Sequence, residues 1–167
     1  KIIIKKPHSR LVTMRLFYAL IFLICFKSYS QKTIHVFVSL CDNINQGIVP
    51  APSKLGNGKD PKNNLYWGAL YGVKTHFKRS NNWQLVKVIS SNDKRILERI
   101  LFKHRRSNIY LLADAYDGKF IKECTIDFLK AASGDFKTVV NEKDVCLKFG
   151  EDAGLLSYIG HDGLMEF

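Results

Sequence analysis

Cysteine is scarce in this sequence, and the number and spacing of the few present exclude a disulfide-dense scaffold and a cysteine zinc site. The 167 residues contain four cysteines, and Cys25 lies in an apolar segment near the start. The other three are too few for a disulfide-dense scaffold, and their spacing matches no zinc-binding pattern. Their odd number leaves open a free thiol or a disulfide to a cysteine outside this chain.

Strong ligands for a hard cation are also missing. Residues 57–64 contain Asn, Asp and Gly, but they lack the spaced acidic ligands and the bidentate Glu of a strong calcium site. We therefore expect neither a metal ion nor a cofactor. No internal repeat occurs, and a chain of this length is expected to hold a single domain.

Acidic residues are absent from the first 30 positions, which hold six basic residues. The formal charge of +11 comes largely from that segment, because residues 31–167 carry 20 basic against 15 acidic residues. Nucleic-acid binding requires a basic face with aromatic or groove-reading partners. The basic run at 103–106 is interpreted as a solvated turn, and no nucleic-acid partner is expected.

The longest uninterrupted apolar run, residues 16–26, has only eleven members. It suits the core of a signal peptide and is too short to span a bilayer. Ser28 and Ser30 supply the small residues that a signal peptidase reads, so cleavage would leave Gln31 first. We expect export to the periplasm or the extracellular space without a stable membrane anchor. The chain divides into an upstream extension, a signal peptide and one mature domain, over residues 1–13, 14–30 and 31–167.

Strand and helix patterns alternate along the mature domain. Runs rich in β-branched, aromatic and aliphatic residues predict strands over 33–41, 83–89, 109–116 and 154–160. Helical spacing of apolar residues predicts helices over 64–79, 94–103 and 119–133. A short strand or hairpin arm is expected over 139–149. This alternation predicts an α/β fold, a three-layer αβα sandwich with a mostly parallel sheet and helices on both faces.

Polar residues follow three of the expected strands. In an open α/β sheet, ligands bind beyond the carboxyl ends of the strands. We therefore expect these residues to converge on one edge of the molecule: Cys41, Asp42, Asn43, Asp117, His161 and Asp162. Asp114 lies inside a strand and is expected to be either buried with a partner or on the edge face.

The sharpest local feature is Gly160-His161-Asp162-Gly163, which directly follows the last expected strand. Glycines leave the backbone open to a substrate chain and can present amide hydrogens to a developing oxyanion. An imidazole titrates near neutral pH, as an acid/base catalyst requires. A plain strand-ending turn is the alternative, because Asp-Gly is a common turn pair.

The order of elements, the Asn-Leu-x-x-Gly-Ala stretch at 64–69 and the apolar strand entering Gly160-His161 together resemble the caspase, legumain and gingipain superfamily of cysteine peptidases. Residues 40–43 and 56–68 also resemble a group of exported bacterial proteins. The resemblance implies a caspase-like fold truncated at its C-terminus. It implies that His161 is the catalytic histidine and that the nucleophilic cysteine follows the next strand, beyond residue 167.

The same resemblance implies roles for the neighbouring residues. Gly160 and Gly163 would shape the oxyanion environment beside His161. The residues expected to contact a peptide or protein substrate are Asp42, Asn43, Asp117 and Asp162. One departure is that Asp162 stands where many members of the superfamily have glycine.

Two alternatives stay open at this point. Cys41 could approach His161 and act as the nucleophile itself, although in the superfamily this position shapes the site instead. The domain could also be a non-catalytic exported binding module that recognises peptide or glycan. Tyr66, Trp67 and Tyr71 would form its binding platform, and core packing explains these aromatic residues equally well.

Overall fold

The computed structural model describes residues 32–47 and 49–162, which all lie in the predicted mature domain. The predicted extension and signal peptide, residues 1–13 and 14–30, lie outside the described residues, as does Gly163. Within the described part of the chain, no helix is long and apolar enough to cross a membrane.

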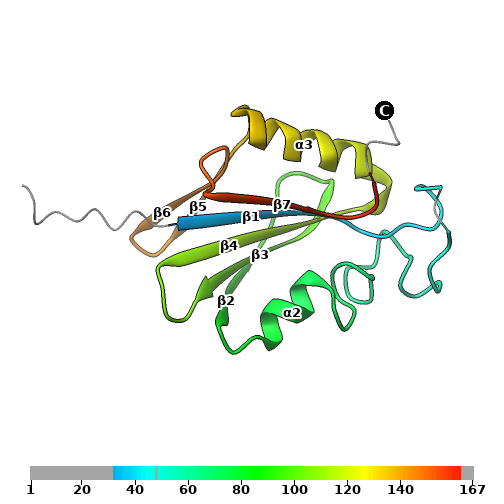
Figure 1. The fold of residues 1–167 in the computed structure, drawn as a ribbon, viewed down its shortest axis with the longest axis horizontal. Helices are drawn as coiled ribbons and strands as arrows, with labels where there is room; N and C mark the ends of the chain where they lie inside the picture. The colour runs from blue at the N-terminus through cyan, green and yellow to red at the C-terminus, as the bar shows by residue number, and fades with distance from the viewer. Residues whose placement is uncertain (1–31, 48, 163–167) are drawn as a thin grey trace, which may run out of the picture. The chain divides into compact units, whose positions relative to one another are not determined.

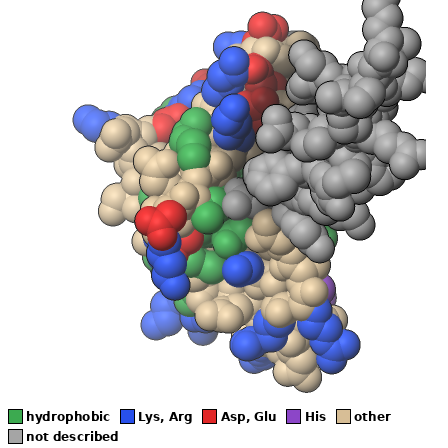
Figure 2. Space-filling view, turned by 90° about the vertical axis from the view of Figure 1, so that its left-hand side faces the viewer, with side chains coloured by type: hydrophobic (Ala, Val, Ile, Leu, Met, Phe, Trp, Pro, Cys, Tyr) green, Lys and Arg blue, Asp and Glu red, His purple; other side chains and the backbone are tan. Residues whose placement is uncertain are grey.

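Side chains of both charges surround an apolar area on the face at which β1 (Lys32–Ser39) begins (Figure 2).

Five strands form the main sheet in the order β2-β3-β4-β1-β7 (Figure 1). Besides β1, they are β2 (Trp83–Ile89), β3 (Ile96–His104), β4 (Ile109–Tyr116) and β7 (Leu155–Ile159). β1 lies parallel to both β4 and β7, whereas β3 lies antiparallel to both β2 and β4. The α/β class is therefore confirmed, but the sheet is mixed where a mostly parallel one was expected.

All four predicted strands occur, but the predicted helix over 94–103 is wrong. This segment forms β3, in which Ile100, Leu101 and Phe102 are consecutive and fully buried. Ile100 and Phe102 pack on one face of the sheet and Leu101 packs on the other. A short apolar run fits a helix face as well as a strand buried on both sides, so spacing alone could not separate them.

The predicted helix over 64–79 is shorter than expected. Only α2 (Val73–Arg79) is helical, and residues 65–72 form a series of turns. Gly72 explains part of the difference, because a β-carbon there would lie only 2.4 Å from the carbonyl oxygen of Trp67. The backbone folds back on itself at this point, which a regular helix does not allow.

The two helices cover opposite faces of the main sheet (Figure 1). On one face, Val73 of α2 packs against Val36 and Val38 of β1. On the other, α3 (Ile121–Ser133) contributes Cys124 and Ala131 to a cluster around Phe37. A 3-10 turn, η1 (Gly118–Phe120), precedes α3, so the predicted helix over 119–133 is present with a tighter start.

The region expected to be a strand or hairpin arm is a two-stranded sheet of its own. β5 (Lys137–Glu142) and β6 (Val145–Gly150) pair antiparallel. Val140, Leu147 and Phe149 pack against Leu101 and Leu112 of the main sheet. The hairpin therefore completes the core beside α3, on the face that α2 does not cover.

Candidate functional site

The carboxyl ends of β1, β4 and β7 meet at one edge, because these three strands are parallel neighbours. Cys41 follows β1, Asp117 follows β4 and His161 follows β7. Leu40 donates its backbone amide to the carbonyl oxygen of Tyr116 at 3.1 Å, which extends the pairing of β1 and β4 to this edge. The parallel part of the mixed sheet thus brings the predicted residues into one region.

His161 lies between a thiol and a phenol. Its Nε2 is 3.6 Å from Sγ of Cys41. The hydroxyl oxygen of Tyr66 is 3.3 Å from Nδ1 and 3.4 Å from Nε2, and the two rings meet edge to face. The backbone carbonyl of His161 accepts a hydrogen bond from the Tyr158 hydroxyl at 3.0 Å. The imidazole is therefore held on several sides while staying partly open to solvent.

Burial shifts the pKa of all three groups of this cluster in the direction that favours the neutral form. It lowers the pKa of the His161 imidazole below its ordinary value. Burial and the charge of Asp42 raise the pKa of the Cys41 thiol. Burial and the neighbouring Cys41 raise that of Tyr66. A neutral imidazole can accept a proton, but the Cys41 thiol is not activated as a thiolate.

Asn64 holds Cys41 and Tyr66 in place from a fully buried position. Its Oδ1 accepts hydrogen bonds from the backbone amides of Cys41 at 3.1 Å and Tyr66 at 3.2 Å. Its Nδ2 donates to the carbonyl oxygens of Cys41 at 2.8 Å and Asn57 at 3.0 Å. The side chain therefore continues the hydrogen bonding of β1 where the strand ends. Sequence analysis considered Asn64 only as the first residue of the predicted helix over 64–79 and of the 64–69 stretch that carries the resemblance.

Three of the predicted substrate-binding residues are engaged in holding loops. The carboxylate of Asp42 accepts the backbone amide of Ile44 at 2.9 Å and the side-chain amide of Asn45 at 2.6 Å. Asn43 exchanges two hydrogen bonds with the backbone of residue 51, at 2.7 and 3.0 Å. Asp117 accepts the backbone amide of residue 119 at 3.2 Å. Their side chains therefore hold the turns that follow β1 and β4 in place.

The other predicted site residues lie around the His161 backbone. Gly160 is packed so closely that a β-carbon there would lie 2.8 Å from the Tyr158 hydroxyl and 3.0 Å from Cβ of Ser39. Asp162 is exposed at the end of the described chain. Gly163 lies outside the described residues, so its predicted contribution to the oxyanion environment has no structural counterpart here.

The aromatic residues considered for a binding platform separate into different environments. Trp67 is fully buried, and its Nε1 donates to Glu98 at 2.7 Å. Tyr66 packs against the same core cluster and contacts His161. Tyr71 alone of the three is exposed, at 89% of its surface. Core packing is therefore the right interpretation for Trp67, and the three rings do not form a shared surface.

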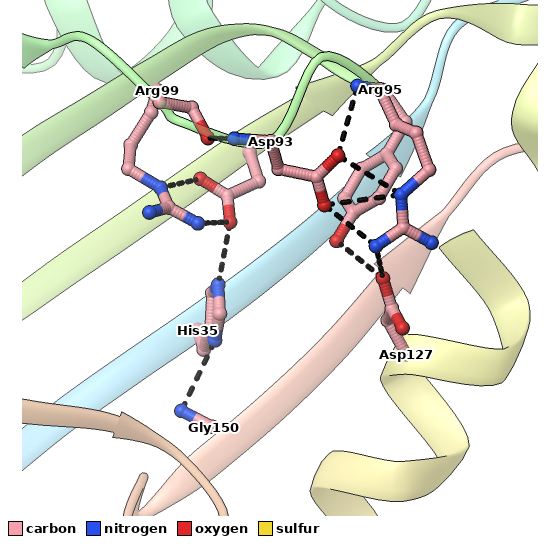
Figure 3. A network of polar contacts seen from close by, with 9 residues as sticks. His35, Asp93, Arg95, Arg99, Asp127 and Gly150 are labelled. Atoms are coloured by element: carbon pink, nitrogen blue, oxygen red, sulfur yellow. Dashed lines mark hydrogen bonds and ion pairs between the residues drawn. The ribbon is translucent and has the colours of Figure 1, made fainter. Parts of the chain in front are cut away.

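A buried charge network crosses the face of the sheet that α3 covers (Figure 3). Asp114 is fully buried and receives two hydrogen bonds of 2.6 Å from Arg99. His35 is also fully buried and lies 3.1 Å from Asp114 through Nε2, while its Nδ1 accepts the backbone amide of Gly150 at 3.1 Å. Of the two alternatives for Asp114, burial with a partner is the one observed.

The network connects four strands, β1, β3, β4 and β6, and its Asp114 and His35 are fully buried, whereas the His161 cluster is partly open to solvent. Accepting at Nδ1 makes His35 a donor at Nε2, so the neutral ring bridges the hairpin to Asp114. Sequence reasoning missed Arg99 because it lay in the segment predicted as helix. The sequence did hold a signal for this pair, because Arg99 and Asp114 are charged residues within apolar runs, and a buried charge requires a partner.

The described residues contain no group of three or more His, Cys, Asp or Glu side chains that could hold a metal ion. Comparisons with protein-family models, with curated proteins and with solved structures found no match for this chain. The assignment of a function therefore rests on the geometry of the site edge and on the resemblance noted in the sequence.

Proposed function

We propose that residues 31–167 form the amino-terminal part of an exported caspase-like cysteine peptidase in which His161 is the acid/base residue. The observation that carries this proposal is the position of His161, which follows β7 at the carboxyl edge of the parallel strands and contacts Cys41 and Tyr66. Burial lowers the pKa of the His161 imidazole, so the ring is neutral and ready to accept a proton at neutral pH.

The proposed reaction is acyl transfer through a thioester. A cysteine thiol gives its proton to His161 as its sulfur attacks the carbonyl carbon of the scissile peptide bond. The C–N bond then breaks, and His161 returns the proton to the leaving amine. Water hydrolyses the thioester in a peptidase, and an amine replaces water in a transpeptidase. Gly160 and Gly163 are proposed to shape the oxyanion environment beside His161, Gly160 through its close packing against Tyr158 and Ser39.

The nucleophilic cysteine is proposed to lie outside residues 1–167, for two reasons that concern Cys41. The Cys41 side chain is fully buried, so a substrate carbonyl has no direct approach to its sulfur. Burial and the nearby Asp42 raise the pKa of its thiol, whereas a nucleophilic cysteine requires a lowered one. Cys41 is instead proposed to pack against one side of the His161 ring.

The test uses the full-length gene product with a peptide library and a thiol-directed activity probe. We expect His161→Ala to lower kcat/KM by about 10²- to 10⁴-fold, the usual contribution of acid/base catalysis. In a plot of wild-type kcat/KM against pH, the midpoint of the acidic limb should lie below about 6.5, the ordinary pKa of histidine. The sign follows because a lowered pKa leaves the ring neutral at more acidic pH.

Cysteine variants locate the nucleophile in the same assay. Probe labelling should persist in Cys41→Ala and in Cys146→Ser, which serves as the exposed control. Loss of labelling in Cys41→Ala alone would identify Cys41 as the nucleophile instead. Cleavage and labelling that survive His161→Ala unchanged would refute the role proposed for His161.

A second candidate is a non-catalytic exported binding module for peptide or glycan. The state of Cys41 favours it, because this cysteine contacts His161 but is buried and has a raised thiol pKa, so it is not activated as a nucleophile. Peptide binding by the full-length product without cleavage or probe labelling would support this candidate. Export itself is tested by mass spectrometry of secreted protein, which should begin at Gln31.

A further inference from the structure

A cavity of about 300 Å³ lies directly beside His161, between α3 and the end of β7. Phe128 and Leu129 of α3 form one wall, and Tyr158 and His161 form the other. The rings of Phe128 and Tyr158 lie 5.9 Å apart between their centroids, so the two walls contact each other through aromatic surface. His161 therefore borders both this cavity and the Cys41–Tyr66 cluster.

The polar groups in the cavity wall already have partners within the chain. The hydroxyl of Thr125 donates to the carbonyl oxygen of Ile121 at 2.9 Å, and that of Tyr158 donates to the carbonyl of His161 at 3.0 Å. What the wall offers to a ligand is mainly carbon surface. Leu129 contributes most visibly, because 46% of this large apolar side chain is exposed.

Charge argues against an acidic occupant. The charged side chain in the described lining is Asp162, a carboxylate that follows His161 directly. An acidic group of a ligand would share the lining with this carboxylate, and no Lys or Arg is among the described lining residues. A neutral, apolar group avoids this pairing of like charges and fits the carbon surface.

We infer that this cavity is the specificity pocket of the site and takes an uncharged apolar side chain of a peptide, such as leucine, methionine or phenylalanine. The inference rests on the proposed function, since it places the scissile bond beside His161 and a neighbouring side chain in the cavity. Apolar side chains favour such a pocket over alanine by about ten- to hundredfold in affinity.

The experiment measures binding, so it does not depend on catalysis. The full chain, carrying nitrogen-15 in its histidines, is titrated with N-acetyl-leucinamide, N-acetyl-phenylalaninamide, N-acetyl-alaninamide and N-acetyl-glutamate amide. The leucine and phenylalanine probes should shift the His161 imidazole resonances and bind at least about tenfold more tightly than the alanine and glutamate probes. Equal binding of all four probes, or tighter binding of the glutamate probe, would overturn the inference.

A matched pair of variants tests the place of binding. Leu129→Lys should weaken the leucine probe by about tenfold or more, because it puts a charge into the apolar wall. Leu155→Lys should leave binding unchanged, because Leu155 is similarly exposed, at 56%, but does not line the cavity. Both side chains are surface-exposed, so both variants should fold, which the amide spectrum checks. Equal weakening in the two variants would contradict the assignment.

The two proposals fail in different ways. Probe binding that is lost in Leu129→Lys, together with no cleavage by the full-length product, would support the pocket and contradict the peptidase. Cleavage that shows no preference for apolar residues near the scissile bond would support the peptidase and overturn the pocket.

Discussion

Single side chains at the site edge owe their positions to a few buried hydrogen bonds. Asn64 is the clearest case, because its amide pairs with both backbone groups of Cys41 and also with the amide of Tyr66. Those two residues in turn contact the His161 ring. One asparagine thus fixes two of the neighbours of the proposed acid/base residue.

Asn64→Ala is expected to lower the free energy of unfolding by about 2–5 kcal/mol, because it leaves several buried backbone groups unpaired at about 1–3 kcal/mol each. Asn63→Ala is the matched control. Asn63 is only half-buried and donates to Asp60 at 2.7 Å, so its loss should cost less than about 1 kcal/mol. Chemical denaturation measures both.

The same pair of variants has a readout at the site. In folded Asn64→Ala, the nitrogen-15 titration of His161 should move, because Tyr66 and Cys41 lose their anchor. It should stay unchanged in Asn63→Ala. An Asn64→Ala protein with wild-type stability and an unmoved His161 titration would contradict the positioning role.

Elements of secondary structure are joined by the buried charges of β3 and β4. Burial disfavours the charged form of Asp114, but hydrogen bonds from Arg99 and His35 outweigh it and hold the pKa of this carboxyl below its ordinary value. Arg99 therefore ties β3 to β4, and His35 ties β1 to β4 and to the end of β6. The network sits far from His161 in sequence and stabilises the sheet that positions it.

Asp114→Asn is expected to destabilise the fold by about 3–5 kcal/mol at pH 7, since it leaves Arg99 as a buried charge without its partner. A carboxyl whose pKa is lower in the folded than in the unfolded state stabilises the fold at any pH above its unfolded pKa, which is about 3.9. This stabilisation is lost as the pH falls through the folded pKa. The difference in the free energy of unfolding between wild type and Asp114→Asn should therefore shrink to zero as the pH falls below about 4.

Thermal unfolding across a pH series checks the Asp114 prediction. Asp144→Asn, at the exposed turn of the β5–β6 hairpin, is the control and should follow the wild-type curve. A constant gap between wild type and Asp114→Asn from pH 7 down to pH 2 would show that the carboxylate charge is not the source of the stabilisation.

At the scale of the whole molecule, packing keeps the three described cysteines from pairing and shields two of them, Cys41 and Cys124, from solvent. Cys41, Cys124 and Cys146 are all free thiols in the described chain, and only Cys146 of these is exposed. These three cysteines form no disulfide with one another in the described chain, and a disulfide to a cysteine outside this chain stays a prediction. Burial raises the pKa of both Cys41 and Cys124, which lowers their reactivity further.

Iodoacetamide should therefore modify Cys146 in the native protein and reach Cys41 and Cys124 only after denaturation. Peptide mass spectrometry of the labelled chain identifies the modified residues. Native labelling of Cys124 at the rate of Cys146 would indicate that α3 does not pack on the sheet as described.

The predicted strands were confirmed because each is a continuous run of β-branched and aliphatic residues bounded by polar turns. The error at β3 has a definite cause. Ile96, Leu97, Ile100 and Leu101 repeat with helical spacing, yet Ile100, Leu101 and Phe102 alternate between two buried faces once β2 and β4 lie on either side. Both faces are buried because the cluster containing Trp67 and Val73 covers one and the β5–β6 hairpin covers the other, which the local sequence does not reveal.

The sequence by itself determined the α/β class, four of the strands, the helix that follows β4 and the place of His161 directly after an apolar strand. These follow from local pattern, since periodicity and turn residues act over a few positions. Only the tertiary structure decided the mixed strand order, the contact of Tyr66 with His161, the role of Asn64 and the pairing of Asp114 with Arg99. Each joins residues distant in the sequence, and such contacts depend on which strands become neighbours.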